Sequence, residues 1–449
     1  MAKRESTLTG WIPRDVHPVA WKALGLSWLL WTLNAFDFML PTILGPNIIN
    51  EFGLTATAFT GLIALIYALR AIFDLPLAAL SDRLGSGWRR RRVWVPLVLV
   101  YAVVSTLSAV KALSGSVGAL FAQRAVVGVG CVGDETIGVT ATSEWWPAKH
   151  RGFAIGLHHT GFPVGTFLAG QLSALVMYLF GADEWRLVFW FSLLSIPLIL
   201  IYRRLSTAEN FAKLGKHADQ DDEAHPHETE GSVSADSPWW SVLKQREVCL
   251  AALYSGLMVI VYFGFSTTFP LYLAYVSDYS LAEVASLSVI WTLVGAVFQV
   301  VLPRLSDRVG RKPLLVFAAV WQCLVMAMVP MATSLVMVVL VQVAWGLVSN
   351  AIPAICYTVC ADAAPPGRVA TAVSFSTTFA YVCSTLALLG SGLLIDAGGG
   401  VHSASGFITA FWILSGISLV TGLMYFLLAR ETKPGGETPV RMESRLVES

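Results

Sequence analysis

The residues of this chain best placed to do chemistry are charges inside apolar runs. Residues 124–139 have the sequence RAVVGVGCVGDETIGV, in which Arg124, Asp134 and Glu135 carry charge. If the run crosses a membrane, each such charge costs at least about 2.5 kcal/mol at the helix centre. Ionisable residues at this depth are rare, so each is a candidate for function.

Three acids are candidate proton carriers. Asp37 interrupts another apolar run, and Asp134 and Glu135 are adjacent. An apolar environment favours the protonated carboxyl, so a buried acid can take up and release a proton near neutral pH. Because neighbouring residues on a helix point about 100° apart, one of the adjacent pair faces the interior, and we favour Asp134.

Two buried arginines are candidate anion sites. A guanidinium stays charged and can hold a carboxylate through two parallel hydrogen bonds. Arg124 and Arg70 are therefore predicted to bind substrate. For Arg70 an alternative stays open, because Asp74 lies one turn later on the same run and the two charges can neutralise each other.

The elements that carry these residues follow from composition. The chain has 449 residues, of which 55% are hydrophobic and 13% charged, whereas soluble domains carry roughly 25% charged residues. This predicts an all-α polytopic membrane protein. The net charge of +1 argues against a nucleic-acid partner. We find no metal-ligand spacing, phosphate-binding loop or nucleophile–base set, so we expect no metal, no cofactor and no enzyme.

Twelve apolar runs are long enough to span a bilayer, which takes about 20 residues. We predict two six-helix halves at 1–203 and 248–429, joined by a cytoplasmic linker at 204–247 and followed by a tail at 430–449. The acidic, polar stretch inside the linker is predicted to be disordered. The runs are 23–48, 57–80, 93–112, 117–143, 153–180, 187–202, 248–276, 283–302, 314–332, 335–360, 369–395 and 404–429.

The distribution of Lys and Arg sets the orientation. With the N-terminus in the cytoplasm, 26 of the 30 basic residues lie in cytoplasmic segments. Lys111 and Arg186 fall in outer loops. This predicts a multi-pass protein of the cell (inner) membrane with both termini cytoplasmic, whose partners are the lipid bilayer, protons and a small-molecule substrate.

The two halves repeat each other at their cytoplasmic loops. Ser81-Asp82-Arg83-Leu84-Gly85 recurs 225 residues later as Ser306-Asp307-Arg308-Val309-Gly310, followed by Arg311-Lys312. Glu144-x2-Pro147, followed by Arg151, recurs 218 residues later as Asp362-x2-Pro365, followed by Arg368. The first copy differs by Ser86-Gly87-Trp88, which separates Gly85 from the basic run Arg89–Arg92. Two repeated halves of six spans are a transporter architecture.

The repeat also serves as an internal control for the deep charges. At the same offsets, Asp37 corresponds to Tyr262 and Arg124 to Gln342. The second half keeps the loop motifs but has no charge at the positions equivalent to the deep ones. The scaffold therefore does not require these charges, which favours a functional role for them. Tyr262 and Gln342 complete the predicted substrate-binding set.

Together these motifs resemble the Major Facilitator Superfamily over nearly the whole chain. The motifs on which this resemblance rests are Asp307-Arg308-x-Gly310-Arg311-Lys312, Arg124-x3-Gly128-x-Gly130 and the acid-Pro-Arg motifs. The resemblance implies two pseudo-symmetric six-helix halves, with loop motifs that form and break contacts as the carrier changes state. The predicted gating residues are Asp82, Arg83, Glu144, Arg151, Asp307, Arg308, Asp362 and Arg368.

Within the superfamily, Asp37 in NAFDF and the acid ten residues after Arg124 resemble the symporters of sialate, hexuronates and aromatic acids. These more often have an Asp or Gly just before the first acid, where this chain has Asn34 and Ala35. The expected function is proton-coupled uptake of a small organic anion such as a sugar acid. The alternatives are a proton-coupled exporter of drugs or metabolites and a non-transporting sensor.

Overall fold

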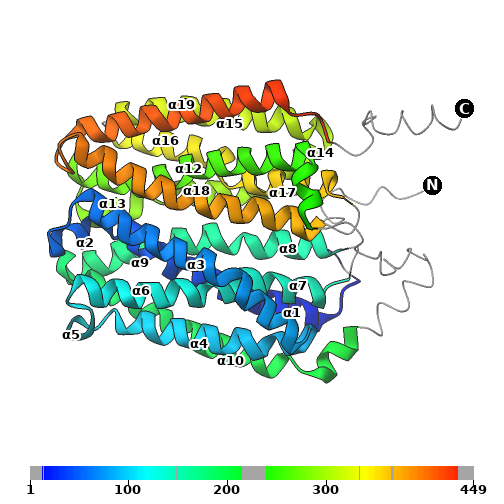
Figure 1. The fold of residues 1–449 in the computed structure, drawn as a ribbon. Helices are drawn as coiled ribbons and strands as arrows, with labels where there is room; N and C mark the ends of the chain where they lie inside the picture. Colours follow the sequence, from blue (N-terminus) through cyan, green and yellow to red (C-terminus); the bar gives the residue numbers. More distant parts are fainter. Residues whose placement is uncertain are drawn as a thin grey trace, which may run out of the picture. The chain divides into compact units, whose positions relative to one another are not determined.

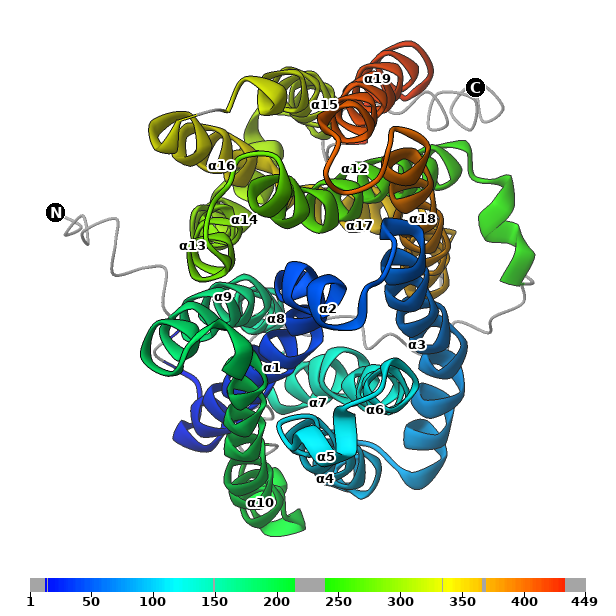
Figure 2. The same cartoon turned by 90° about the vertical axis from the view of Figure 1, so that its left-hand side faces the viewer.

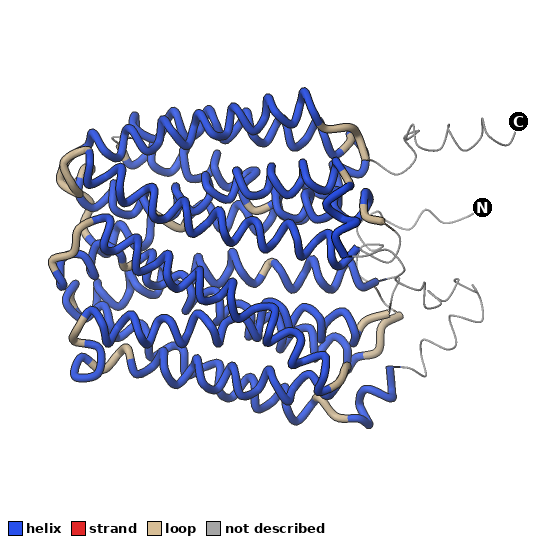
Figure 3. Tube along the Cα trace, viewed as in Figure 1, coloured by secondary structure: helices blue, strands red, loops and turns tan. Residues whose placement is uncertain are grey.

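The computed structural model describes residues 13, 15–147, 150–214, 239–332, 334–365 and 369–432. Within these ranges the secondary structure is helical, with loops and turns between the helices (Figure 3). The predicted all-α fold is therefore confirmed. The stretch 216–238, predicted as a disordered linker, and residues 433–449 of the predicted tail lie outside the described residues.

The helices follow the predicted apolar runs closely. Backbone polar groups find no water in the bilayer core, so a spanning segment must bond them internally, as a helix does. In the first half the helices are α1 (Pro18–Ile43), α2 (Gly45–Phe52), α3 (Ala56–Leu84), α4 (Arg91–Leu107), α5 (Lys111–Ser114), α6 (Val117–Val132), α7 (Gly138–Trp145), α8 (Arg151–His159), α9 (Gly161–Phe180) and α10 (Ser195–Leu205), with the short helices η1 (Gly87–Arg90), η2 (Gly133–Ile137) and η4 (Ala182–Leu194) (Figure 1).

The second half repeats the arrangement. Its elements are η5 (Trp239–Lys244), α12 (Arg246–Tyr275), α13 (Leu281–Leu287), α14 (Ile290–Val309), α15 (Arg311–Met328), η6 (Val329–Met331), α16 (Leu335–Ser349), α17 (Ala351–Ala363), α18 (Val369–Ala397) and α19 (Ala404–Leu428). In the described part of the chain, 11 helical segments are long and apolar enough to cross a membrane. The third predicted run corresponds to α4, which has 17 residues.

The fourth and tenth spans are both interrupted near their middle. In the fourth, α6 and α7 are joined by η2, a five-residue π-helix. In the tenth, Asn350 separates α16 from α17. Such irregularities inside helices are frequent at functional sites. Gly130 brings α6 close to α4, because a Cβ there would collide with Tyr101.

By their contacts the residues form two compact units whose boundaries differ from those of the predicted halves. Unit 1 comprises 1–38, 72–165 and 189–229, and unit 2 comprises 39–71, 166–188 and 230–449. Unit 2 therefore joins the whole second half to two segments of the first half. Unit 1 is organised around contacts of α4 with α6 and α10, and unit 2 around α12 with α18 and α15 with α19 (Figure 2).

Unit 2 has two ends that the chain direction defines. At the near end the chain enters α12 and leaves α19. At the far end α12 and α18 finish. Because successive spans alternate in direction, α14 finishes at the near end, where α15 begins. The core between the two ends is apolar, with Tyr254, Leu315 and Ile352 among its buried residues.

Candidate transport site and gating clusters

The structure brings Asp37 and Arg124 together inside unit 1. Asp37 of α1 is fully buried, and Arg124 of α6 is 2% exposed. Asp37 Oδ1 lies 3.9 Å from Arg124 Nη1. The sequence proposed separate roles for these residues, 87 positions apart, whereas the fold makes them an ion pair. Burying two charges costs them their hydration, and their mutual attraction offsets this cost only if further hydrogen bonds assist the pair.

Two serines, which sequence reasoning missed, supply that assistance to the acid. The hydroxyls of Ser105 (α4) and Ser192 (η4) donate to Asp37 Oδ1 at 2.5 and 2.7 Å. Arg124 Nη2 donates to Ser108 Oγ at 2.8 Å. A serine in an apolar run carries no charge that would mark it in the sequence, so only the packing of α1, α4, α6 and η4 reveals these contacts.

The Asp37–Arg124 pair still has unused hydrogen-bonding capacity. Asp37 Oδ2 and Arg124 Nε and Nη1 have no hydrogen-bond partner among the described residues. The guanidinium also lies 4.5 Å from the centre of the Phe189 ring, a cation–π distance. The site thus holds a cation, an acid and buried polar atoms that a ligand or a proton can engage.

Asp134 is held differently, at the π-helix η2. Its Oδ1 accepts from Trp94 Nε1 at 2.5 Å and its Oδ2 from Asn34 Nδ2 at 2.8 Å. Asn34 also donates to the carbonyl of Cys131 at 3.0 Å, which ties α1 to the end of α6. Asp134 is fully buried, whereas Glu135 is partly exposed. Asp134 is thus the more enclosed member of the pair, and its predicted role in proton transfer stays a prediction.

Arg70 and Asp74 lie on α3 in different units. In unit 2 the Arg70 guanidinium lies 5.7 Å from the centre of the Tyr381 ring and is 3% exposed. In unit 1 Asp74 accepts a hydrogen bond from Thr136 at 2.5 Å. Arg70 is therefore buried beside an aromatic ring, and its substrate-binding role stays a prediction.

The predicted residues of the second half form a neutral polar cluster. Tyr262 Oη donates to Asn350 Oδ1 at 3.3 Å, and its ring meets Trp291 edge-to-face at 5.1 Å. Gln342 Oε1 accepts from the backbone N–H of Trp291 at 3.3 Å. This amide lies in the first turn of α14, so Gln342 caps that helix. Gln342 Nε2 has no hydrogen-bond partner among the described residues.

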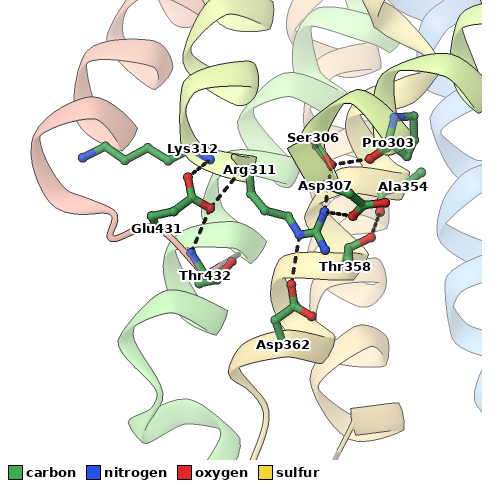
Figure 4. A network of polar contacts seen from close by, with 10 residues as sticks. All are labelled: Pro303, Ser306, Asp307, Arg311, Lys312, Ala354, Thr358, Asp362, Glu431 and Thr432. Atoms are coloured by element: carbon green, nitrogen blue, oxygen red, sulfur yellow. Dashed lines mark hydrogen bonds and ion pairs between the residues drawn. The ribbon is translucent and has the colours of Figure 1, made fainter. Parts of the chain in front are cut away.

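At the near end of unit 2, Arg311 is the centre of the loop motif (Figure 4). Its guanidinium contacts Asp307 at 2.6 Å and Asp362 at 2.9 Å. It also donates to Ser306 Oγ at 2.8 Å, while its backbone N–H binds Glu431 at 2.9 Å. One arginine thus joins the end of α14, the end of α17 and the segment after α19.

In unit 1, Arg90 makes the contacts that correspond to those of Arg311. Its guanidinium contacts Glu144 at 2.7 Å and Ser81 Oγ at 3.2 Å. The backbone N–H of Gly87 also binds Glu144, at 2.6 Å, in a left-handed conformation with φ 61°. The extra residues Ser86-Gly87-Trp88 therefore preserve the acid–arginine–serine contact and add a donor to it.

The predicted gating set needs two additions. Arg90 binds Glu144, and Arg311 binds Asp307 and Asp362, although neither arginine was in the predicted gating set. Arg83 and Arg308 are exposed. The side chains of Asp82 and Arg151, and all of Arg368, lie outside the described residues. The repeat of Ser81 and Glu144 as Ser306 and Asp362 is the signal that could have identified Arg90.

The profile of the Major Facilitator Superfamily matches residues 27–318 and 257–448. The chain is 27% identical over 196 residues to the sialic acid transporter NanX of Escherichia coli (strain K12), covering 44% of this chain and 46% of NanX. It is 23% identical over 445 residues to the hexuronate transporter of the same strain, covering 94% and 97%.

The fold is also similar to a solved structure. A bacterial homologue of the human lysosomal transporter Spinster, crystallised in an inward-facing, unoccupied conformation, matches with a TM-score of 0.73 at 17% identity. The match covers 93% of this chain and 98% of that one. At this identity the likeness concerns the fold. Profile, full-length relative and fold agree: the chain belongs to the Major Facilitator Superfamily and is a multi-pass membrane transporter, not an enzyme.

Proposed function

We propose that the chain is a proton-coupled importer of a small organic anion, such as a sugar acid or another carboxylate, in the cell membrane with both termini cytoplasmic. The observation that carries this proposal is the buried Asp37–Arg124 ion pair, three of whose polar atoms have no hydrogen-bond partner among the described residues. The names of the relatives, which include sialic acid and hexuronate transporters, support the substrate class.

The chemistry of the pair links proton and anion. While Asp37 is ionised, it attracts the guanidinium of Arg124. When Asp37 takes a proton, that attraction is lost and the guanidinium is available to a substrate carboxylate. The empty site then holds one positive and one negative charge, and the loaded site holds the arginine, a neutral acid and the anion. Both have zero net charge, so neither carries an uncompensated charge through hydrocarbon.

The other deep groups have supporting roles in this proposal. Asp134, between Trp94 and Asn34, and its neighbour Glu135 are further proton-binding candidates. Arg70 beside Tyr381, with Tyr262 and Gln342 of the second half, completes the proposed substrate-binding set. The loop clusters centred on Arg90 in unit 1 and on Arg311 in unit 2 each hold helix ends together, and they change partners during the transport cycle.

The test is substrate-driven proton movement. In de-energised cells expressing the chain, adding a hexuronate, sialic acid or gallate should make the medium alkaline, whereas the neutral sugar xylose should not. Acidification of the medium would instead support an exporter. Binding without counterflow would support a sensor.

The proton site is tested with Asp37→Asn, which cannot cycle a proton. In proteoliposomes with a pH gradient we expect it to lose accumulation and to keep counterflow. Glu51→Gln is the matched control, because Glu51 binds Trp185 and Arg186 away from the site, and it should accumulate normally. Full accumulation by Asp37→Asn would remove Asp37 from coupling.

A further inference from the structure

The first turn of α3 is capped by an acid from the other half of the sequence. Within unit 2, Asp396 near the end of α18 accepts from the backbone N–H of Ala56 at 3.1 Å and of Thr57 at 2.8 Å. The first N–H groups of a helix lack partners in their own helix and form the positive end of its dipole. A carboxylate there is a strong, charge-assisted cap. The bond therefore fastens a first-half helix to a second-half helix.

Close packing makes this cap possible. Gly392 lies one turn before Asp396, and a Cβ at Gly392 would collide with Thr57 and Thr60. One turn earlier again, Leu389 lies against Gly61. The spacing of three and four residues puts Leu389, Gly392 and Asp396 on one face of α18. That face is shaped for the start of α3.

Further polar contacts join the halves of the sequence at the far end of unit 2, and two of them involve pairs of side chains. Tyr275 Oη, at the end of α12, donates to Asn50 Oδ1 at 2.6 Å. Gln171 of α9 donates to the carbonyl of Ser286 in α13 at 3.1 Å and accepts from its hydroxyl at 3.0 Å. These two contacts are neutral, whereas the contact of Asp396 is ionic in character.

We propose that Asp396 is the release latch of the far end: its bond to the first turn of α3 stabilises the state in which this end is closed, and the bond breaks each time the end opens. The inference rests on the proposed transport function, because alternating access requires both ends to open in turn. It adds a specific contact whose strength sets the balance between the two states.

The latch predicts a shift in populations when the charge is removed. Loss of a helix-capping side chain weakens a helix start by about fivefold in equilibrium terms. Asp396→Ala should therefore raise the open fraction at the far end by about that factor. Gly392→Val should raise it further, because the added side chain prevents the close approach of α18. Glu51→Gln is the matched control: it removes a charge at the same end, but Trp185 and Arg186, its partners, lie in the first half.

Hydrogen–deuterium exchange of the full-length chain in lipid nanodiscs, without substrate, measures this opening. We expect faster exchange in Asp396→Ala at three places together: the first turn of α3, the α2 segment that binds Tyr275, and the α13 segment that binds Gln171. Glu51→Gln should leave the last of these unchanged. Faster exchange confined to the first turn of α3 would mean that Asp396 is only a local cap.

The same variants separate this inference from the proposed function. If no organic anion drives proton movement in the wild-type chain, the proposed function fails, yet concerted exchange in Asp396→Ala still supports the latch. If the wild type transports an anion and Asp396→Ala retains both the wild-type exchange pattern and the wild-type rate, the latch is wrong while the function stands.

Discussion

At equivalent positions, the two halves of the sequence connect their spans through different buried polar groups. In the first half, Asp37 pairs with Arg124 across α1 and α6. In the second half the equivalent residues are Tyr262, which binds Asn350, and Gln342, which caps α14. Both arrangements tie spans together through buried polar contacts. The scaffold can thus be built from neutral groups, so packing alone does not account for the charges of the first half, which we propose serve transport.

The interrupted spans extend this comparison. The π-helix η2 of the fourth span presents Asp134 to Trp94 and Asn34. The break of the tenth span presents Asn350 to Tyr262, and close packing against Gly295 holds its amide. A local irregularity thus exposes polar atoms for side-chain contact in both halves, and only the first half places an acid there. The proposed proton coupling therefore rests on residues of the first half.

The largest effect is expected when Arg124 is replaced by the residue type found at the equivalent position of the second half. Arg124→Gln reproduces the residue at the equivalent position, Gln342, and leaves Asp37 buried without its cation. In the proposed loaded site the substrate carboxylate pairs with Arg124, and removing one partner of a buried charge pair costs about 2–5 kcal/mol of binding free energy. Carboxylate binding should therefore weaken by about a hundredfold or more. Arg124→Lys keeps the charge but loses the planar guanidinium, so its carboxylate affinity should lie between those of the wild type and Arg124→Gln. Ligand titration of the purified variants measures both.

A stability control separates binding from packing in that experiment. The double variant Asp37→Asn with Arg124→Gln removes both charges and should recover thermal stability lost in Arg124→Gln, while anion binding stays lost. If Arg124→Gln misfolds and Arg124→Lys binds normally, then Arg124 is a packing charge, and the contrast drawn between the halves is wrong.

A smaller effect is expected at the loop clusters, where the halves agree. Asp362 and Asp307 share Arg311, but their side chains are 20% and 59% exposed. Because solvent screens the more exposed pair, Asp362→Asn should slow turnover more than Asp307→Asn. Both should leave substrate affinity near the wild-type value, since they shift populations rather than contacts. Single-turnover and steady-state transport, with binding measured separately, distinguish the two effects. A variant that loses affinity while its conformational equilibrium is unchanged would contradict the gating role.

The sequence predicted the fold and the loop motifs better than the site. Hydrophobic runs and the repeated Asp-Arg-x-Gly motif depend on local spacing, so the span limits and the acids Asp307 and Asp362 of the loop cluster could be anticipated. Their cation Arg311 belongs to the motif but was not in the predicted gating set. The pairing of Asp37 with Arg124 depends on how α1 packs against α6, which no local pattern encodes. The contacts of Ser105 and Ser192 with Asp37 likewise depend on the packing of the helices and not on a local pattern. Arg90 was not recognised because the extra residues Ser86-Gly87-Trp88 change its distance along the chain from the Asp-Arg-x-Gly motif. In the fold it still contacts Glu144.

The smallest effect compares one hydrogen bond from each half. Trp94→Phe removes a 2.5 Å donor from a buried acid, whereas Tyr262→Phe removes a 3.3 Å bond between neutral groups. Hydrogen bonds to charged groups contribute about 1.5–3 kcal/mol and neutral ones about 0.5–1.5 kcal/mol, and long bonds lie at the weaker end. Trp94→Phe should therefore lower the thermal unfolding midpoint more than Tyr262→Phe does, and the difference should shrink when Asp134→Asn is the background, because the acceptor is then neutral. An equal difference in both backgrounds would show that the indole acts by filling space, and the case for a charged group at the break of the fourth span would lose this support.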